Sequence, residues 1–108
     1  MKKNIIKKNL IKAIHENILL KKKLFLLNDD ISNAIKIIFD TLRKGNKILI
    51  CGNGGSAADA QHLSAEFLIR LRPNVNRKPL PIISLSLDSS TMTACGNDYS
   101  FDDLFART

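Results

Sequence analysis

The chain has 108 residues, 44% of them hydrophobic and 25% charged, and its formal net charge is +7. This length suits one small domain, and the apolar content is enough for a core, which excludes a wholly disordered chain. Lysines interrupt every early apolar run, so a signal peptide is not expected, and no stretch has the eighteen or so apolar residues of a membrane span. We therefore expect a cytoplasmic protein without a membrane partner.

The positive charge is concentrated at the N-terminal end. Residues 1–28 hold eight lysines and one acid, Glu16, whereas residues 29–108 carry nine basic and nine acidic side chains. A basic arm for nucleic acid or anionic lipid is one interpretation, but no aromatic residue interleaves the lysines, so a solvated helix face is favoured and a nucleic-acid partner is not expected. The distant Cys51 and Cys95 predict reduced thiols, neither a disulfide nor a metal pair.

Two helices are predicted before residue 45. The first, over about 3–26, has an apolar residue at every fourth position: Ile6, Leu10, Ile14 and Ile18. Residues 28–30 (NDD) mark a break and offer N-caps for the second helix. Its apolar face comprises Ile31, Ala34, Ile35, Ile38 and Leu42. Gly45 supplies the left-handed stop. We expect residues 1–45 to form an antiparallel helical hairpin.

Residues 46–108 predict the first part of an α/β domain. Lys47–Cys51 is a short aliphatic run bounded by glycines, which indicates a buried strand; residues 56–70 are helical, and Ile82–Leu87 is a second strand. A strand-helix-strand crossover gives parallel strands, so the fold class is α/β with a doubly wound, Rossmann-like parallel sheet. Asp88 and the serines after it offer caps for a short helix ending near Gly96.

The last residues predict one more helix. Ser100 and Asp103 resemble a capping box, and Phe101, Leu104 and Phe105 form an apolar stripe. Two parallel strands cannot form a complete covered sheet, so either a partner chain completes it or the chain is the front part of a longer domain. We favour the second explanation.

The stretch CGNGGSAADAQHLSAE (51–66) is the main candidate site. Ligands collect at the carboxyl ends of parallel strands, and glycines before a helix N-terminus suit an anion or a polyhydroxylated molecule. GNGGSA formally fits a dinucleotide loop, but no acid follows at the required distance, and no lysine completes a P-loop. A glycine turn without a ligand also stays open.

Asp59, His62 and Glu66 are spaced three and four apart, which places them on one face of the helix. Glu66 could act as a general base, with His62 beside it or holding a divalent ion such as zinc. From spacing alone a surface pair that stabilises the helix is favoured.

Taken together, CGNGGSAADAQHLSAE, LPIISLSLDSS and ACGNDYSFDDLFAR resemble the phosphoheptose isomerases of the sugar isomerase (SIS) domain group, from about Gly45 to Thr108. The resemblance implies a cytoplasmic homotetramer that interconverts sedoheptulose 7-phosphate and D-glycero-D-manno-heptose 7-phosphate, towards the ADP-heptose of lipopolysaccharide cores. It implies Glu66 as catalytic base and substrate contact, and His62 with Glu66 as zinc ligands. The further substrate contacts that it implies are Asn53, Gly54, Gly55, Asn97 and Asp98.

The resemblance also sets limits on this chain. A serine-rich phosphate loop, a glutamine and a second histidine that complete the family's site are expected beyond Thr108, so the 108 residues alone should be inactive. The alternative function is a non-catalytic SIS protein that binds a phosphosugar or associates with the bacterial replication initiator and lacks the catalytic glutamate. Glu66 favours the isomerase.

Overall fold

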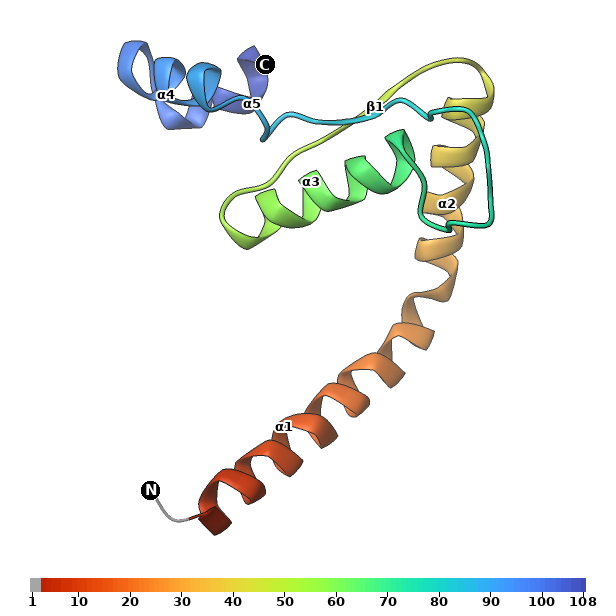
Figure 1. The fold of residues 1–108 in the computed structure, drawn as a ribbon, viewed down its shortest axis with the longest axis vertical. Coiled ribbons are helices and arrows are strands. Elements are labelled where there is room, and N and C mark those ends of the chain that lie inside the picture. Colours follow the sequence, from red (N-terminus) through yellow and green to blue (C-terminus); the bar gives the residue numbers. More distant parts are fainter. Residues whose placement is uncertain (1–2) are drawn as a thin grey trace. The chain divides into compact units, whose positions relative to one another are not determined.

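The computed structural model describes residues 3–108, which form helices and one small parallel sheet (Figure 1). The elements are α1 (Lys3–Lys23), η1 (Leu24–Leu27), α2 (Asn28–Arg43), β1 (Ile48–Ile50), α3 (Gly55–Leu68), β2 (Ile82–Ser84), α4 (Ser89–Asp98), η2 (Phe101–Asp103) and α5 (Leu104–Arg107). They divide into two compact units, one that ends at Ile37 and one from Ile38 to Thr108. Within residues 3–108, no helix is both long and apolar enough to cross a bilayer.

Both N-terminal helices are present, but their junction differs from the prediction. Asn28, expected to cap α2 after a break, has helical dihedrals of φ −56° and ψ −41°, and its N–H donates to the carbonyl of Phe25. The chain instead tightens into the 3₁₀ segment η1, whose i→i+3 bonds satisfy the backbone between two helices. Asn28 is therefore the first residue of α2 and not its N-cap.

The apolar side chains of the N-terminal unit lie on its surface. Every residue from Asn4 to Ile37 is exposed, and Phe25 is exposed to 83%. On α1 the lysines from Lys7 to Lys23 are exposed, and so are the apolar Ile14 and Ile18, so both kinds of side chain are accessible to solvent. The unit boundary lies inside α2, and the assignment of residues 1–45 to a separate hairpin stays a prediction.

The end of α2 is fixed by its predicted glycine. Gly45 has φ +78°, a left-handed conformation that glycine adopts without steric cost. Its N–H donates to Leu42 O at 3.0 Å, and the N–H of Asn46 donates to Thr41 O at 3.1 Å. This pair of bonds is a Schellman motif, which satisfies the last carbonyls of the helix and turns the chain into β1.

Strands β1 and β2 pair in parallel, as the crossover rule predicted, with Ile48 opposite Ile82 and Ile50 opposite Ser84. Each strand has three residues and is shorter than the sequence run that predicted it. The last ladder bond runs from Leu85 N–H to Ile50 O at 2.8 Å. Beyond this bond the two strands separate: β1 leads into the glycine loop and β2 into the segment before α4.

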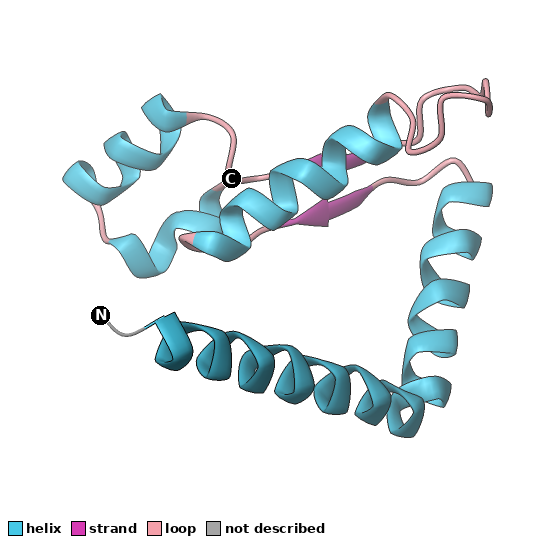
Figure 2. Ribbon diagram, turned by 60° about the horizontal axis from the view of Figure 1, so that its bottom comes forward, coloured by secondary structure: helices cyan, strands magenta, loops and turns pink. Residues whose placement is uncertain are grey.

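Helix α3 covers one face of the strand pair (Figure 2). Its small residues Ala60 and Ser64 are buried against β2, and the hydroxyl of Ser64 donates to Ile82 O at 2.8 Å. Small side chains at this contact let the helix approach the sheet closely. The buried apolar side chains of the described chain are Ala60, Ile82, Cys95 and Leu104.

The C-terminal helices follow the predicted caps in part. The carboxylate of Asp88 accepts from Ser90 N–H at 2.9 Å and caps α4 as predicted. The hydroxyl of Ser100 donates to the Asp103 carboxylate at 2.9 Å, whereas a capping box would direct it to the Asp103 N–H. The predicted apolar stripe is also incomplete, because Phe101 stays exposed.

Candidate functional site

The three glycines that follow β1 have different structural roles. A Cβ on Gly52 would lie 2.6 Å from the backbone carbon and oxygen of Ser56, so only glycine lets the loop pass the first turn of α3. Gly54 has φ +56° and ψ −120°, which is strained for any other residue. Gly55 begins α3 in open space. Two of these glycines are therefore required by the backbone, independently of any ligand.

Two amides in the first turn of α3 are already engaged by the loop. The N–H of Ser56 donates to Asn53 O at 3.1 Å, and the N–H of Ala57 donates to Gly54 O at 3.1 Å. An anion cradle would need these donors free. A ligand at this loop would therefore meet mainly the exposed Asn53 side chain. An amide side chain suits the hydroxyl groups of a sugar better than a phosphate.

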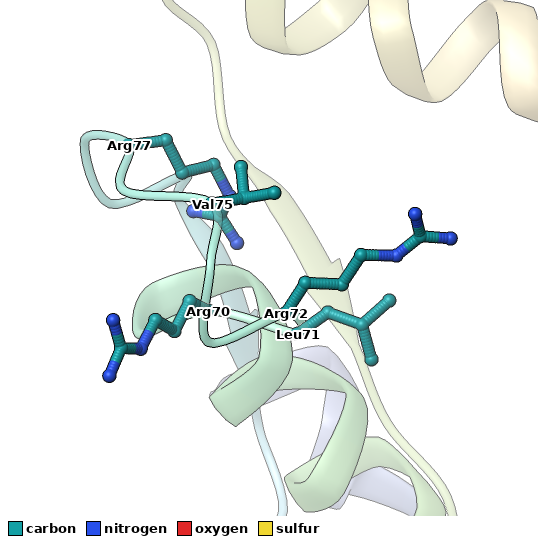
Figure 3. A pocket seen from close by; sticks show the side chains of 5 residues that line it. All are labelled: Arg70, Leu71, Arg72, Val75 and Arg77. Atoms are coloured by element: carbon teal, nitrogen blue, oxygen red, sulfur yellow. The ribbon is translucent and has the colours of Figure 1, made fainter.

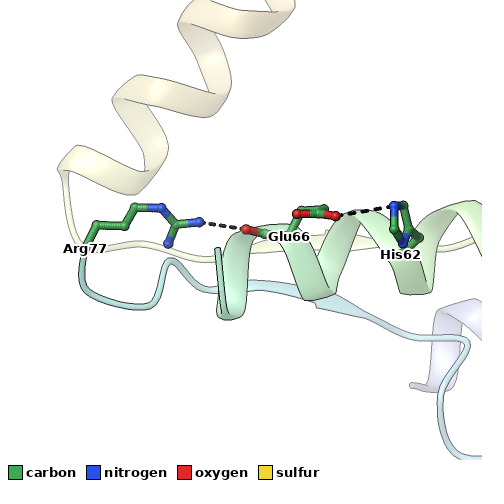
Figure 4. A network of polar contacts seen from close by, with 3 residues as sticks. All are labelled: His62, Glu66 and Arg77. Atoms are coloured by element: carbon green, nitrogen blue, oxygen red, sulfur yellow. Dashed lines mark hydrogen bonds and ion pairs between the residues drawn. The ribbon is translucent and has the colours of Figure 1, made fainter. Parts of the chain in front are cut away.

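His62 and Glu66 form the predicted pair on α3 (Figure 4). His62 Nε2 lies 3.4 Å from Glu66 Oε1, with the His62 side chain 79% exposed and the Glu66 side chain 25% exposed. The i, i+4 spacing brings the two groups together, because side chains one turn apart share a helix face. A mostly covered carboxylate beside a water-accessible imidazole can exchange protons with a substrate or share a cation.

Arg77 was missed by the sequence reasoning, and it fixes the end of α3 that carries Glu66 (Figure 4). Its guanidinium donates to the backbone carbonyls of Glu66 and Phe67, each at 2.7 Å. These are carbonyls that the helix end leaves without an internal partner, and a cation there also suits the helix dipole. No local signal marks this arginine, because it lies nine residues after the end of α3, beyond an irregular loop.

An apolar cavity of about 240 Å³ adjoins Glu66 and Arg77. Its other lining residues are Leu63, Phe67, Leu71 and Leu80. A smaller hollow of about 140 Å³ lies in the loop after α3 (Figure 3). Arg70 and Arg72 line this hollow but their guanidinium groups point away from each other, so the arginines do not converge on one anion.

The remaining predicted contacts lie at the end of α4. Asn97 and Asp98 are exposed, and Asn97 Nδ2 donates to Asp98 Oδ1 at 2.7 Å. Helix α4 and the start of α3 lie beyond the same end of the strand pair, as the crossover topology requires (Figure 1). Glu66 lies about three turns further along α3, about 16 Å from Gly55 at 1.5 Å per residue. The structure therefore places the glycine loop and α4 at one end of the strands, and Glu66 away from it.

Within residues 3–108, no three side chains of histidine, cysteine, aspartate or glutamate gather as a metal site would require. His62 and Glu66 supply two donors of types that bind zinc. They fit one part of a four-coordinate site and leave the other positions to groups outside the described residues.

A strand-helix-strand unit with a glycine loop at its carboxyl end defines an α/β domain of the class that binds small ligands at strand ends. The SIS domain model matches residues 14–108, and the chain belongs to this family. Phosphoheptose isomerase from Chlorobaculum tepidum is 56% identical over 80 residues, which are 74% of this chain and 38% of that protein. Phosphoheptose isomerase from Shewanella loihica is 53% identical over 81 residues, which are 75% of this chain and 40% of that protein.

Solved structures agree with the fold. Phosphoheptose isomerase GmhA from Neisseria gonorrhoeae superimposes with a TM-score of 0.82 at 35% identity, over 94% of this chain and 52% of that one. A phosphoheptose isomerase from Francisella tularensis gives 0.75 at 33% identity, over 99% of this chain and 52% of that one. The family resemblance and the fold class predicted from the sequence are confirmed. The chain spans about two fifths of the length of the curated relatives it matches.

Proposed function

We propose that the complete protein containing this chain is an aldose-ketose isomerase that interconverts sedoheptulose 7-phosphate and D-glycero-D-manno-heptose 7-phosphate, towards ADP-heptose and the lipopolysaccharide core. One observation carries the proposal: a partly buried Glu66 carboxylate lies 3.4 Å from His62, in a chain that is 56% identical over 80 residues to a protein named phosphoheptose isomerase. In this proposal Asn53, Gly54 and Gly55 contact the sugar together with Asn97 and Asp98, whose side chains are accessible.

The chemistry explains why a carboxylate is needed. An aldose-ketose isomerase removes a proton from the carbon beside a carbonyl and returns it to the neighbouring carbon through an enediol. Glu66 takes the proton and gives it back, and His62 is placed to orient the carboxylate. A positioned base contributes about 10²- to 10⁴-fold, so stabilisation of the developing oxygen charge must come from further groups.

We include zinc in this proposal, with His62 and Glu66 as two of its ligands. When bound, zinc would polarise the substrate oxygens as a Lewis acid. A glutamine and a second histidine from beyond Thr108 would complete the ligand set. The fit rests on the 3.4 Å separation of the two donor atoms and on their donor types.

We also propose a cytoplasmic homotetramer. A base must come within about 2.6–3.2 Å of the proton it abstracts, whereas Glu66 and the glycine loop of one chain are about 16 Å apart along α3. In this proposal a group from another copy of the chain completes the site at Glu66. Further copies would also cover the exposed apolar side chains of α1 and α2. The free thiols of Cys51 and Cys95 suit a reducing compartment.

The deciding experiment replaces Glu66 by Gln in the full-length protein. Turnover of sedoheptulose 7-phosphate should fall at least about 10²-fold while the unfolding temperature stays the same, since the amide keeps the shape and loses the basic oxygen. Asp59→Asn is the matched control, because it makes the same chemical change on the same helix face and should retain activity. A fully active Glu66→Gln enzyme would refute the base assignment, and a wild-type protein that binds sugar phosphate without turnover would favour the non-catalytic SIS alternative.

The zinc assignment is tested separately by metal analysis of the purified full-length protein. We expect about one zinc per subunit and its loss in His62→Ala, because removing one of four ligands weakens a tetrahedral site strongly. Gln61→Ala, one position earlier, should retain the metal, because the Gln61 side chain bonds Ser86 O and takes no part in the proposed ligand set. Full metal occupancy in His62→Ala would contradict the assignment.

A further inference from the structure

A buried serine joins the two strands beyond their last ladder bond. The hydroxyl of Ser86 donates to Gly52 O at 3.1 Å and accepts from Gly52 N–H at 3.4 Å. Ser86 is only 4% exposed. One side chain therefore satisfies both backbone groups of the residue from which the glycine loop departs, at a point where backbone pairing has ended.

Ser86 is itself held from two other sides. Its carbonyl accepts from Gln61 Nε2 of α3 at 2.5 Å, and its N–H donates to the hydroxyl of Ser84 at 3.2 Å. All hydrogen-bonding groups of Ser86 are thus engaged, so its backbone and side chain are held in one conformation. We call Ser86 with Gln61 and Ser84 the Ser86 clasp. It ties the glycine loop to β2 and to the helix that carries His62 and Glu66.

The loop depends on this anchor for its conformation. Gly54 has φ +56° and ψ −120°, a region that glycine enters readily, and the loop holds three glycines around Asn53 and before Ser56. Glycines lose more backbone freedom on folding than other residues, so contacts at both ends are needed to hold the loop in one conformation. The Ser86 clasp fixes the N-terminal end of the loop, and the first turn of α3 fixes the other end.

We propose that Ser86 is a positioning residue that holds the Gly52–Gly55 loop in its substrate-binding conformation. The inference rests on the proposed function, in which this loop contacts the sugar phosphate. Because Ser86 is buried and bonds the backbone of Gly52, its effect on the loop would pass through Gly52 to Asn53.

The experiment compares two deletions of a buried hydroxyl in the full-length protein. Ser86→Ala should raise KM for sedoheptulose 7-phosphate about tenfold or more, with kcat changed less than about threefold, because a displaced loop weakens binding. Ser64→Ala is the matched control: its hydroxyl is as buried but bonds Ile82 O, away from the loop. It should lower the unfolding temperature to a similar extent and leave KM within about twofold.

Amide hydrogen exchange gives a readout that does not depend on activity. Residues 53–56 should exchange faster in Ser86→Ala and not in Ser64→Ala. If Ser86→Ala does not fold, Gln61→Ala tests the same inference. It removes only the hydrogen bond from Gln61 to Ser86 O and should also raise KM. An unchanged KM with unchanged loop exchange, or an equal KM rise in Ser64→Ala, would overturn the inference.

The two proposals fail in different ways. If the wild-type full-length protein turns over no sugar phosphate, the proposed function is lost, and the exchange comparison still decides whether Ser86 holds the loop. If the wild type is active and Ser86→Ala matches it in KM and in exchange, the function stands and the positioning role is lost.

Discussion

Replacing Gly52 by alanine should destabilise the protein more than any other glycine change in the loop. The new Cβ would lie 2.6 Å from the backbone carbon and oxygen of Ser56 and 2.7 Å from its Cβ. These atoms belong to the first turn of α3, so no side-chain rotation relieves the contact. Overpacking of this kind costs about 1–3 kcal/mol, and we expect about 3 kcal/mol because α3 must move away from the end of β1.

The neighbouring glycines serve as internal controls. Gly55→Ala meets no atom within 4 Å and lies at the start of a helix, so stability should stay the same or rise by up to about 1 kcal/mol. Gly54→Ala has space for the methyl group but a positive φ, so about 1–2 kcal/mol should be lost to strain. Thermal and urea unfolding of the full-length protein at one fixed concentration measure all three. If Gly52→Ala is as stable as Gly55→Ala, the close approach of loop and helix is refuted.

Two further predictions concern the helix ends. Arg77→Leu should lower the free energy of unfolding by about 1–2 kcal/mol, because the carbonyls of Glu66 and Phe67 lose their charged donor. Arg77→Lys should recover only part of this stability. Equal stability of wild type and Arg77→Leu in urea unfolding would contradict the role of Arg77 at the helix end. The pKa of Asp88 is lowered mainly by the hydrogen bond from the Thr91 hydroxyl and to a smaller extent by bonds from backbone N–H groups. The stabilising contribution of the Asp88 carboxylate is therefore complete above the ordinary carboxyl pKa of about 3.9 and is lost as pH falls through the lowered value. Unfolding temperatures measured from pH 6 to about pH 2 should fall less steeply in Asp88→Asn than in wild type, and parallel profiles would exclude this linkage.

The fold of residues 38–108 was largely predictable because its signals are local. A glycine with positive φ ends α2, an aspartate caps α4, and aliphatic runs mark the two strands. The strand lengths were not predictable. Leu87 looks like a strand residue in the sequence, but pairing ends earlier because β1 ends at Ile50 and the chain turns into its glycine loop.

The candidate site was predictable only where its parts share one helix. The spacing of His62 and Glu66 places their side chains together, and the structure confirms the pair. The contacts of Ser86 with Gly52 join residues 34 positions apart and carry no local pattern beyond serines that alternate with aliphatics. By contrast, the distance between Glu66 and the loop follows from the helix predicted over residues 56–70, because each helical residue adds about 1.5 Å.

The parallel pairing of Ile48 with Ile82 has a consequence for synthesis of the protein. A ribosome adds roughly 5–20 residues per second, so β1 emerges about 2–7 s before its partner strand. During this interval α3 can form from local contacts alone, which takes microseconds or less. The nascent chain therefore carries an unpaired aliphatic strand and exposed apolar helices for seconds, which is the stage of synthesis at which it is most prone to aggregate.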